Sequence, residues 1–334
     1  MRIAVLDNLK KNAPPAEPLV PDTWAELSKT EEVQPIVDVL QSAGHTAEFL
    51  EGGPTLVDLL PRFQPDLCFN MCEGHFGESR ESQVPAILEM LRLPYTGAGV
   101  LALALTLDKV MTKRWLSFHG IPTPPFQVFT RADETLDPAL HFPLFVKPAR
   151  EGSGKGVTAD SITENERQLR ETVARITALY RQPALVERFI RGREVTVGLL
   201  GNPQQRLTVL PPLEIVFRDP GRGVYSHSIK SAPPDGWVAG KHYMCPAPLE
   251  TGLQQHIERL AREAFVLTGC RDYARIDFRL DSEDNDQPYL LEVNALPGIF
   301  RDWSDMSLQA KAAGMSYEEL ILGIVGFAES RWKR

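Results

Sequence analysis

Two short segments near the C-terminus, Ala274-Arg275-Ile276-Asp277 and Leu291-Glu292-Val293-Asn294, decide the fold. Polar and apolar residues alternate in each segment, and residues 281–288 between them are mostly turn formers. This pattern predicts two antiparallel strands with an exposed connection. Because residues i and i+2 of a strand point to the same face, we expect four polar side chains to converge on one surface: Arg275, Asp277, Glu292 and Asn294.

These four side chains suit a magnesium site beside an anion. Mg²⁺ usually takes one or two protein carboxylates and completes its coordination shell with phosphate oxygens and water. A guanidinium next to the carboxylates suits a bound carboxylate or phosphate. Taken alone, the pattern fits equally well an ordinary sheet whose exposed face happens to be charged.

The bulk composition is that of a globular protein of two or three domains, because the chain has 334 residues, 43% of them hydrophobic and 24% charged. The net charge of −8 and the lack of a long basic run argue against nucleic-acid binding. The longest apolar run, residues 100–107, is too short to cross a membrane, and the first residues lack the apolar core of a secretory signal. Four scattered cysteines predict reduced thiols. We therefore expect a cytoplasmic protein.

Alternating strand and helix patterns fill the first hundred residues. Strands are predicted at residues 2–6, 46–50 and 67–70, and helices at 34–43 and 55–63. This alternation predicts an α/β domain with a doubly wound parallel sheet.

The later part of the chain is richer in strands. Helical patterns cover residues 105–118, 163–180, 249–267 and 316–327, and a long loop is predicted at 219–243. We therefore predict three parts: an N-terminal domain at residues 1–104, a part with a glycine-rich loop at 105–184, and a part with the strand pair at 185–334.

The glycine-rich loop is Gly152-Ser153-Gly154-Lys155-Gly156, and it follows a predicted strand that ends at Lys147. Its backbone N–H groups could close over phosphates, and Lys147 is well placed to reach one. It is not a P-loop, because that motif needs Gly where Ala149 stands and Ser or Thr where Gly156 stands. A flexible hairpin tip is the alternative interpretation.

Two carboxylates further along the chain, Glu187 and Glu194, flank an apolar segment. They could accept hydrogen bonds from an adenine amino group and from ribose hydroxyls. A single Glu at such a place is ordinary surface charge. Their order along the chain gives these residues their weight: Lys109, Lys147, the glycine-rich loop, the two Glu residues and then the strand pair.

This ordered set resembles the ATP-grasp superfamily and, within it, the D-alanine–D-alanine ligases. The resemblance runs from about residue 65 to the end of the chain. It is carried by stretches that keep the family order: Leu93-Pro94-Tyr95-Thr96-Gly97, Asp108-Lys109, residues 145–153, Val186-Glu187, Glu194-Val195-Thr196-Val197, Pro246-Ala247, Ala274-Arg275-Ile276-Asp277 and residues 291–298.

The resemblance implies an α/β ATP-grasp fold, with the nucleotide between the second and third parts, and an ATP-dependent ligase that uses Mg²⁺, or Mn²⁺ in its place. ATP would phosphorylate a carboxylate, and the amine of a second small molecule would attack the acylphosphate to give a dipeptide-like amide. It also implies a homodimer with amino-acid or carboxylate substrates. The implied nucleotide ligands are Lys109, Lys147, Glu187, Phe189, Ile190 and Glu194; the implied metal ligands are Asp277, Glu292 and Asn294; the implied catalytic residues are Arg275, Ser153 and Lys230.

The chain departs from the family pattern at the amino-acid sites. The usual Gly-Gly-x-Ser-x-Glu segment after the first strand is missing, and Ser231 stands where the lid often carries Tyr. In the altered segment at residues 299–308, Ser304 or Ser307 is the candidate contact for a substrate carboxylate, and Glu78 is a candidate for binding an amine. We therefore expect that the protein is not an efficient, exclusive D-alanine–D-alanine ligase.

Two other classes of function remain open. One is an ATP-grasp kinase that stops at phosphoryl transfer, and the other is a nucleotide-binding protein without turnover. The complete set of four polar residues on the strand pair disfavours the second, because a binding protein has less need of all four.

Overall fold

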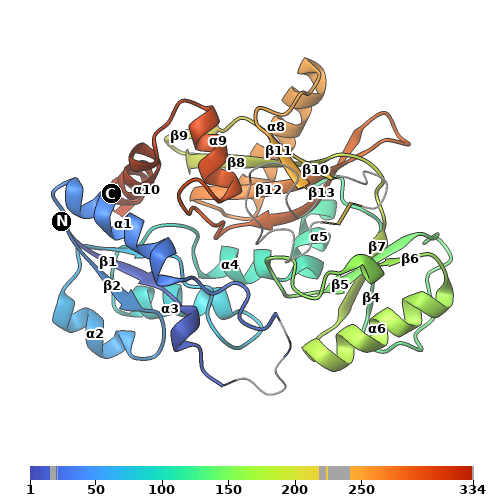
Figure 1. Cartoon of the computed structure of the whole chain (residues 1–334), viewed down its shortest axis with the longest axis horizontal. Helices are drawn as coiled ribbons and strands as arrows, with labels where there is room; N and C mark the ends of the chain where they lie inside the picture. Colours follow the sequence, from blue (N-terminus) through green and yellow to red (C-terminus); the bar gives the residue numbers. More distant parts are fainter. Residues whose placement is uncertain (16–19, 21, 218–222, 225–240, 333–334) are drawn as a thin grey trace.

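The structure, a computed structural model, describes residues 1–15, 20, 22–217, 223–224 and 241–332. Within these residues the strands form three sheets, which Figure 1 shows with the N-terminal sheet in blue, the second in green and the third in yellow to red. Short 3₁₀ helices lie at Lys10–Asn12, Arg80–Ser82 and Ala159–Ser161.

The N-terminal sheet is parallel, with the order β2-β1-β3. Its strands are β1 (Arg2–Asp7), β2 (Thr46–Glu51) and β3 (Leu67–Asn70). The helices of this region are α1 (Thr30–Ser42), α2 (Leu56–Phe63) and α3 (Gln83–Met90). The predicted parallel sheet and its first two helices are confirmed.

The helix predicted at residues 105–118 is wrong in one respect, since two helices occupy this region: α4 (Val100–Leu107) and α5 (Lys109–Phe118). Asp108 separates them in an extended conformation, and its side chain caps α5 by accepting a hydrogen bond from the backbone N–H of Met111 at 2.9 Å. An Asp that accepts from the N3 amide is a strong N-terminal cap, so a second helix begins here.

The second sheet is antiparallel, with the order β4-β7-β5-β6. It consists of β4 (Phe126–Phe129), β5 (Leu144–Pro148), β6 (Ile162–Thr163) and β7 (Ala184–Arg188), and α6 (Glu166–Tyr180) packs on it. The helix predicted from residue 163 begins later, because Asn165 caps it by accepting from the backbone N–H of Gln168.

The third sheet carries the predicted strand pair, and its order is β11-β10-β8-β12-β13, with β9 paired to β8. Its strands are β8 (Glu194–Asn202), β9 (Arg206–Val209), β10 (Leu213–Phe217), β11 (Lys241–Met244), β12 (Asp272–Asp281) and β13 (Gln287–Asn294). The helices α8 (Thr251–Leu267) and α9 (Asp305–Ala312) accompany this sheet. Part of the long loop predicted at 219–243 is strand β11, and most of the remainder lies outside the described residues.

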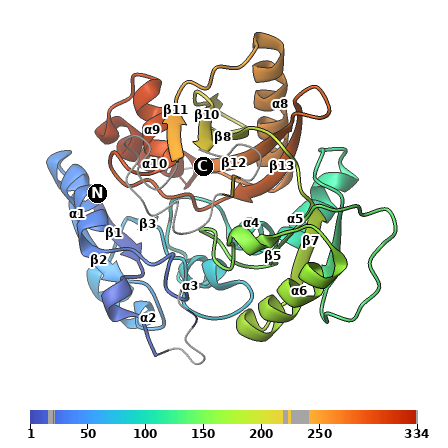
Figure 2. The same ribbon diagram turned by 45° about the vertical axis from the view of Figure 1, so that its right-hand side comes forward.

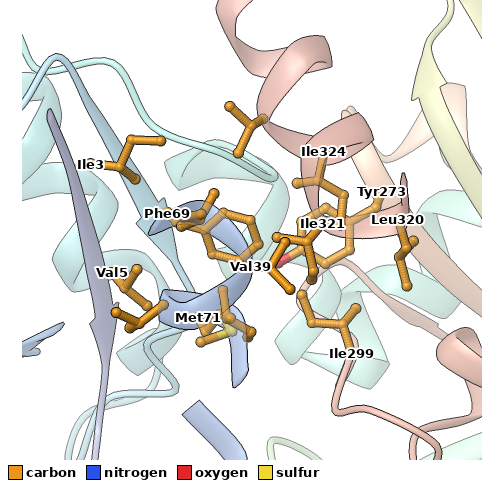
Figure 3. Close-up of a cluster of buried hydrophobic side chains, with 14 of the residues drawn as sticks. Ile3, Val5, Val39, Phe69, Met71, Tyr273, Ile299, Leu320, Ile321 and Ile324 are labelled. Atoms are coloured by element: carbon orange, nitrogen blue, oxygen red, sulfur yellow. The ribbon is translucent and has the colours of Figure 1, made fainter. Parts of the chain in front are cut away.

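The last helix, α10 (Tyr317–Trp332), packs against α1 and joins the core of the N-terminal sheet. Figure 3 shows side chains of β1, β3 and α1 facing Leu320, Ile321 and Ile324 of α10, with Tyr273 and Ile299 beside them. Figure 2 shows the same proximity of α10 to the N-terminal elements. The two ends of the chain therefore share one apolar core.

The structure bears on two expectations from the composition, namely reduced cysteines and the lack of a membrane-spanning segment. The four cysteines are free thiols. In the part of the chain that the structure describes, no helix has both the length and the apolar character needed to span a membrane.

Candidate active site

The strand pair forms as the sequence predicts, with Arg275 opposite Asn294 and Asp277 opposite Glu292. The register shifts directly after this point, between Asp277 and Phe278. The four polar side chains thus lie in two adjacent cross-strand pairs, where facing side chains are close enough to interact.

Asp277 is the centre of this group. Its two carboxylate oxygens accept from Nε and Nη2 of Arg275 at 2.9 Å each, and from Asn294 Nδ2 at 3.0 Å and Thr196 Oγ1 at 2.6 Å. Burial opposes the charge of Arg275, but Asp277, Asp305 and other carboxylates outweigh it and raise the pKa of this guanidinium well above its ordinary value. Arg275 is therefore a permanent positive charge at the site.

The oxygen-bearing side chains Asp277, Glu292 and Asn294 fit one kind of metal site. Within the described residues, no three His, Cys, Asp or Glu side chains form a cluster that could hold a metal ion alone. Two carboxylates and an amide fit Mg²⁺ that shares its shell with phosphate oxygens. Lys109 Nζ lies 3.5 Å from Glu292 Oε2, which adds a cation for a phosphate beside these oxygens.

A first cavity lies between the second and third sheets, and we call it the nucleotide cavity. All six residues predicted to bind the nucleotide line it, and Asp277 and Glu292 do so as well: Lys109, Lys147, Glu187, Phe189, Ile190 and Glu194. Apolar side chains, including Phe145 and Leu291, complete the wall. The cavity thus combines apolar walls with many convergent charged groups, a combination that suits a charged small molecule.

Two lysines share one buried carboxylate at this cavity. Glu187 lies 2.7 Å from Lys147 Nζ and 2.9 Å from Lys113 Nζ, and the three side chains are 3%, 10% and 1% exposed. Burial lowers the pKa of Lys113 to about 8 against the opposing effect of Glu187. The sequence reasoning missed Lys113, although its spacing of four residues from Lys109 on one helix was a usable signal.

Glu194 also has a partner that the sequence reasoning missed. Arg279 Nη1 donates to Glu194 Oε2 at 2.9 Å, and Arg279 Nη2 donates to the backbone oxygen of Gly223 at 3.0 Å. The guanidinium lies 5.3 Å from the ring centre of Phe189 and 5.8 Å from that of Phe217. Arg279 thus joins a predicted nucleotide ligand to Gly223, which also lines the cavity.

The glycine-rich loop lies between the nucleotide cavity and a second cavity. Gly154 and Lys155 line the first, and Gly152 and Ser153 line the second. Ser153, Gly154 and Gly156 have φ angles of 48°, 69° and 73°, a backbone region that is easy only for glycine. This conformation gives the loop its tight turn.

The second cavity, which we call the substrate cavity, has a volume of about 550 Å³. Arg275 and Asn294 of the strand pair line it, and two predicted site residues from other segments, Ser153 and Ser304, meet them there. Lys109 and Glu292 line both cavities. The two cavities are thus adjacent along the strand pair.

The other predicted site residues lie elsewhere. Glu78 is 79% exposed, forms an ion pair with Arg150 at 2.6 Å, and lines a separate cavity on the outer side of the loop. Ser307 is buried on α9 and is not among the residues that line the substrate cavity within the described part of the chain. Lys230, like Ser231, lies outside the described residues.

Three carboxylates that the sequence reasoning did not select line the substrate cavity: Glu26, Glu73 and Glu81. Glu26 lies 2.8 Å from both Arg80 Nη2 and Lys155 Nζ. Burial acts to raise the pKa of Glu26, but the two cations have the larger combined effect and lower that pKa to about 2. Burial raises the pKa of Glu73 well above its ordinary value and that of Glu81 to about 7, although Arg80 acts in the opposite direction on both. Among the described residues, ion pairs therefore compensate the charge of Glu26 but not the charges of Glu73 and Glu81.

The sequence is similar to one family model and to several known proteins. The family model described as D-ala D-ala ligase C-terminus matches residues 115–326. An uncharacterized protein of Sinorhizobium fredii is 37% identical over 313 residues, which cover 89% of this chain and 87% of that protein. The D-alanine–D-alanine ligase of Bordetella avium is 36% identical over 297 residues, which cover 88% of each chain.

The fold is also that of a solved structure. A D-alanine–D-alanine ligase from Bacillus anthracis, complexed with ATP, superposes with a TM-score of 0.75 and 21% identity over 100% of this chain and 99% of that one. This match confirms the predicted ATP-grasp fold. The sequence matches and the shared fold together show that this chain belongs to the D-alanine–D-alanine ligase family of ATP-dependent ligases.

Proposed function

We propose that this protein is an ATP- and Mg²⁺-dependent carboxylate–amine ligase that forms a dipeptide-like amide through an acylphosphate, with substrate sites altered from those of its relatives. One observation carries the proposal: Lys109 and Glu292 line both the nucleotide cavity and the substrate cavity. A phosphate bound near these two residues would therefore be within reach of a carboxylate in the substrate cavity.

The proposed chemistry needs positioning and charge neutralisation more than covalent help from the protein. Lys109 and Lys147 would hold the phosphates, Glu187 and Glu194 the adenosine, and Asp277, Glu292 and Asn294 the metal ion. Bound Mg²⁺ supplies neutralisation of the charge on the phosphate oxygens.

Two bond changes complete the proposed reaction. A substrate carboxylate oxygen attacks the γ-phosphorus of ATP, and ADP leaves. The amine then attacks the acyl carbon, phosphate leaves with the former carboxylate oxygen, and the nitrogen loses its proton. Arg275 would stabilise the oxyanion of the tetrahedral intermediate, while the loop at Ser153 would exclude water from the acylphosphate. Lys230, in the loop predicted at residues 219–243, is proposed to act on the phosphate.

The uncompensated carboxylates of the substrate cavity support an ammonium group on one substrate. Within the described residues, Glu73 and Glu81 neither accept a side-chain hydrogen bond nor form an ion pair. A bound ammonium would supply the charge that burial makes costly to leave unpaired. We therefore propose these two residues, in place of the exposed Glu78, as the amine receptors.

The walls of the substrate cavity support a substrate pair other than two D-alanines. Lys10, Lys29, Phe300 and Trp303 line a volume of about 550 Å³ together with the carboxylates. Two further cations and two large aromatic side chains suit a larger or more acidic partner than alanine. Ser304 is the proposed contact for the carboxylate of this partner.

The proposal also includes a cytoplasmic homodimer. Helix α5 exposes Met111, Trp115 and Phe118, which are 49%, 40% and 80% exposed. Their spacing places them on one side of the helix, and such an apolar face is suited to a second copy of the chain. Sedimentation velocity would show whether the protein is a dimer.

Phosphate release in a screen of carboxylate and amine pairs tests the function. If the protein is a ligase of this kind, phosphate release requires ATP, a carboxylate and an amine together. The kcat/KM with D-alanine as the only amino acid should be lower than the kcat/KM with another substrate pair. ADP formation with one substrate and no amine would instead indicate a kinase. Binding of ATP without any release would indicate a protein without turnover.

A further inference from the structure

A segment between β1 and α1, residues 22–28, extends from the N-terminal sheet to the glycine-rich loop, and we call it the strap (Figure 1). One end is tied to the residues after β1, because Ser28 N–H donates to the Asn8 oxygen at 3.0 Å and Lys10 N–H donates to the Ser28 oxygen at 2.8 Å. The strap is therefore anchored on the N-terminal domain.

The other end of the strap is bound to the glycine-rich loop and to the end of α6. Asp22 Oδ2 accepts from the backbone N–H of Gly156 at 2.7 Å, and the hydroxyl of Tyr180 donates to the same carboxylate at 2.9 Å. Asp22 thus fixes the backbone of the last glycine of the loop to a helix of the second sheet.

Glu26 makes the second attachment through Lys155. Their charged atoms are 2.8 Å apart, and the two side chains are 5% and 6% exposed. Glu151, at the start of the loop, also forms an ion pair with Lys155. Arg80 donates to Glu26 at 2.8 Å and to the backbone oxygen of Arg150 at 2.9 Å, which closes the network around the loop.

The strap and the loop are in close contact. A Cβ atom on Gly152 would lie 2.3 Å from Glu26 Oε1, a distance that no side chain could adopt without displacing the carboxylate. Glycine at residue 152 is therefore needed for Glu26 to approach the loop. Glu26 also lines the substrate cavity, so an occupant of that cavity would touch the strap.

We infer that Asp22 and Glu26 are positioning residues that hold the glycine-rich loop over the nucleotide phosphates, and that Lys155 serves as the attachment point for Glu26 and not as a phosphate ligand. A lysine in such a loop would ordinarily be assigned to a phosphate. Here two carboxylates already hold it, and a phosphate would have to compete with both. The inference rests on the proposed function, because it assumes that the loop covers ATP.

The two roles for Lys155 predict opposite results for Glu26→Gln and the same result for Lys155→Met. If Lys155 is the attachment point, Glu26→Gln and Lys155→Met both loosen the loop and weaken ATP binding, each by about tenfold, because each removes the same charge-assisted hydrogen bond. If Lys155 binds phosphate, Lys155→Met weakens ATP binding, while Glu26→Gln frees the ammonium and strengthens it.

The experiment measures the Kd of a non-hydrolysable ATP analogue by calorimetry, without amino-acid substrates. Asp22→Asn is the second test, because it weakens the attachment at Gly156 without touching a lysine, and we expect a weaker Kd there as well. Glu171→Gln is the control, since it removes one carboxylate from an exposed ion pair with Arg167 on α6. The melting temperature of each variant shows whether it is folded.

The outcomes separate the two proposals. Weaker binding in all three test variants, with the control unchanged, supports the strap, and a lowered kcat in the phosphate-release assay would accompany it. Unchanged or tighter binding in Glu26→Gln overturns the role of Lys155 as an attachment point, and normal binding in folded Asp22→Asn overturns the strap. A wild-type protein that does not bind the analogue overturns the proposed function itself.

Discussion

Asp277 on β12 lies directly opposite Glu292 on β13, with a register shift immediately beyond Asp277. This pairing brings two carboxylates together at the boundary of the two cavities, where Lys109 also lies 3.5 Å from Glu292. The relationship is fixed by backbone pairing and does not depend on a loop. It therefore gives a rigid base for the proposed metal and phosphate site.

Replacing either carboxylate should remove turnover and keep the fold. We expect Asp277→Asn or Glu292→Gln to lower kcat by at least about a hundredfold, because each 1.36 kcal/mol of lost transition-state stabilisation costs about tenfold in rate. The measurement is phosphate release at saturating Mg²⁺, with circular dichroism as the check on folding. Activity near that of wild type in either variant would contradict the metal assignment.

Removing Lys113 should destabilise the protein and weaken ATP binding together. Lys113→Met leaves the buried Glu187 with Lys147 alone, and breaking a buried ion pair typically costs about 3–5 kcal/mol. We expect a lower midpoint of urea unfolding and a higher KM for ATP, with partial recovery in Lys113→Arg.

Lys311→Met is the matched control for Lys113, because its ion pair with Asp302 is exposed, at 72% and 63% for the two side chains. Exposed pairs contribute about 0–1 kcal/mol, so its unfolding midpoint should stay close to that of wild type. Equal shifts of the unfolding midpoint in the two variants would show that the buried ion pair of Lys113 with Glu187 stabilises the protein no more than an exposed pair does.

Neutralising the proposed amine receptors should raise the KM for the substrate whose ammonium group they bind more than the KM for ATP. Glu81→Gln and Glu73→Gln each remove a carboxylate from the substrate cavity. A hydrogen bond to a charged group contributes about 1.5–3 kcal/mol, so we expect an increase of at least tenfold in the KM for the substrate that carries this ammonium group. Glu78→Gln is the control, and an effect of this variant larger than that of Glu81→Gln would return the amine site to Glu78.

Asp7 should make stability depend on pH. Burial raises the pKa of Asp7 from 3.8 to about 7, against opposing hydrogen bonds from Ser28 and Asn8. The folded state therefore binds more protons than the unfolded state between about pH 4 and pH 7, so stability falls as pH rises through this window and stays lower above it. One unit of pKa corresponds to about 1.4 kcal/mol, which sets an upper limit of about 4 kcal/mol on the loss.

Asp7→Asn removes this titration, so its Tm should exceed that of wild type by more at pH 8 than at pH 5. Asp38→Asn is the control, since Asp38 is an exposed residue of α1 and its substitution should change Tm equally at both pH values. A gain for Asp7→Asn that is the same at pH 5 and pH 8 would show that the Asp7 carboxyl is not perturbed in the folded protein.

Features that depend on local periodicity and on chain order were predictable from the amino-acid sequence. Alternation around Arg275 and Glu292 predicted the strand pair, because side chains of a strand alternate between two faces. The first three strands and the six residues of the nucleotide cavity were likewise predictable, since they follow from strand–helix alternation and from an ordered resemblance. The split of the helix at Asp108 was missed because a cap inside a continuous helical pattern gives a weak signal.

Contacts between distant segments follow from tertiary packing and were not predictable from the sequence. The pairing of Glu26 with Lys155 and the packing of α10 against α1 join residues that are far apart in the chain. No periodic pattern encodes such contacts, because they depend on how complete elements pack once apolar surfaces are buried. For the same reason the sequence suggested the exposed Glu78 as an amine receptor, whereas the structure brings Glu73 and Glu81 to the substrate cavity.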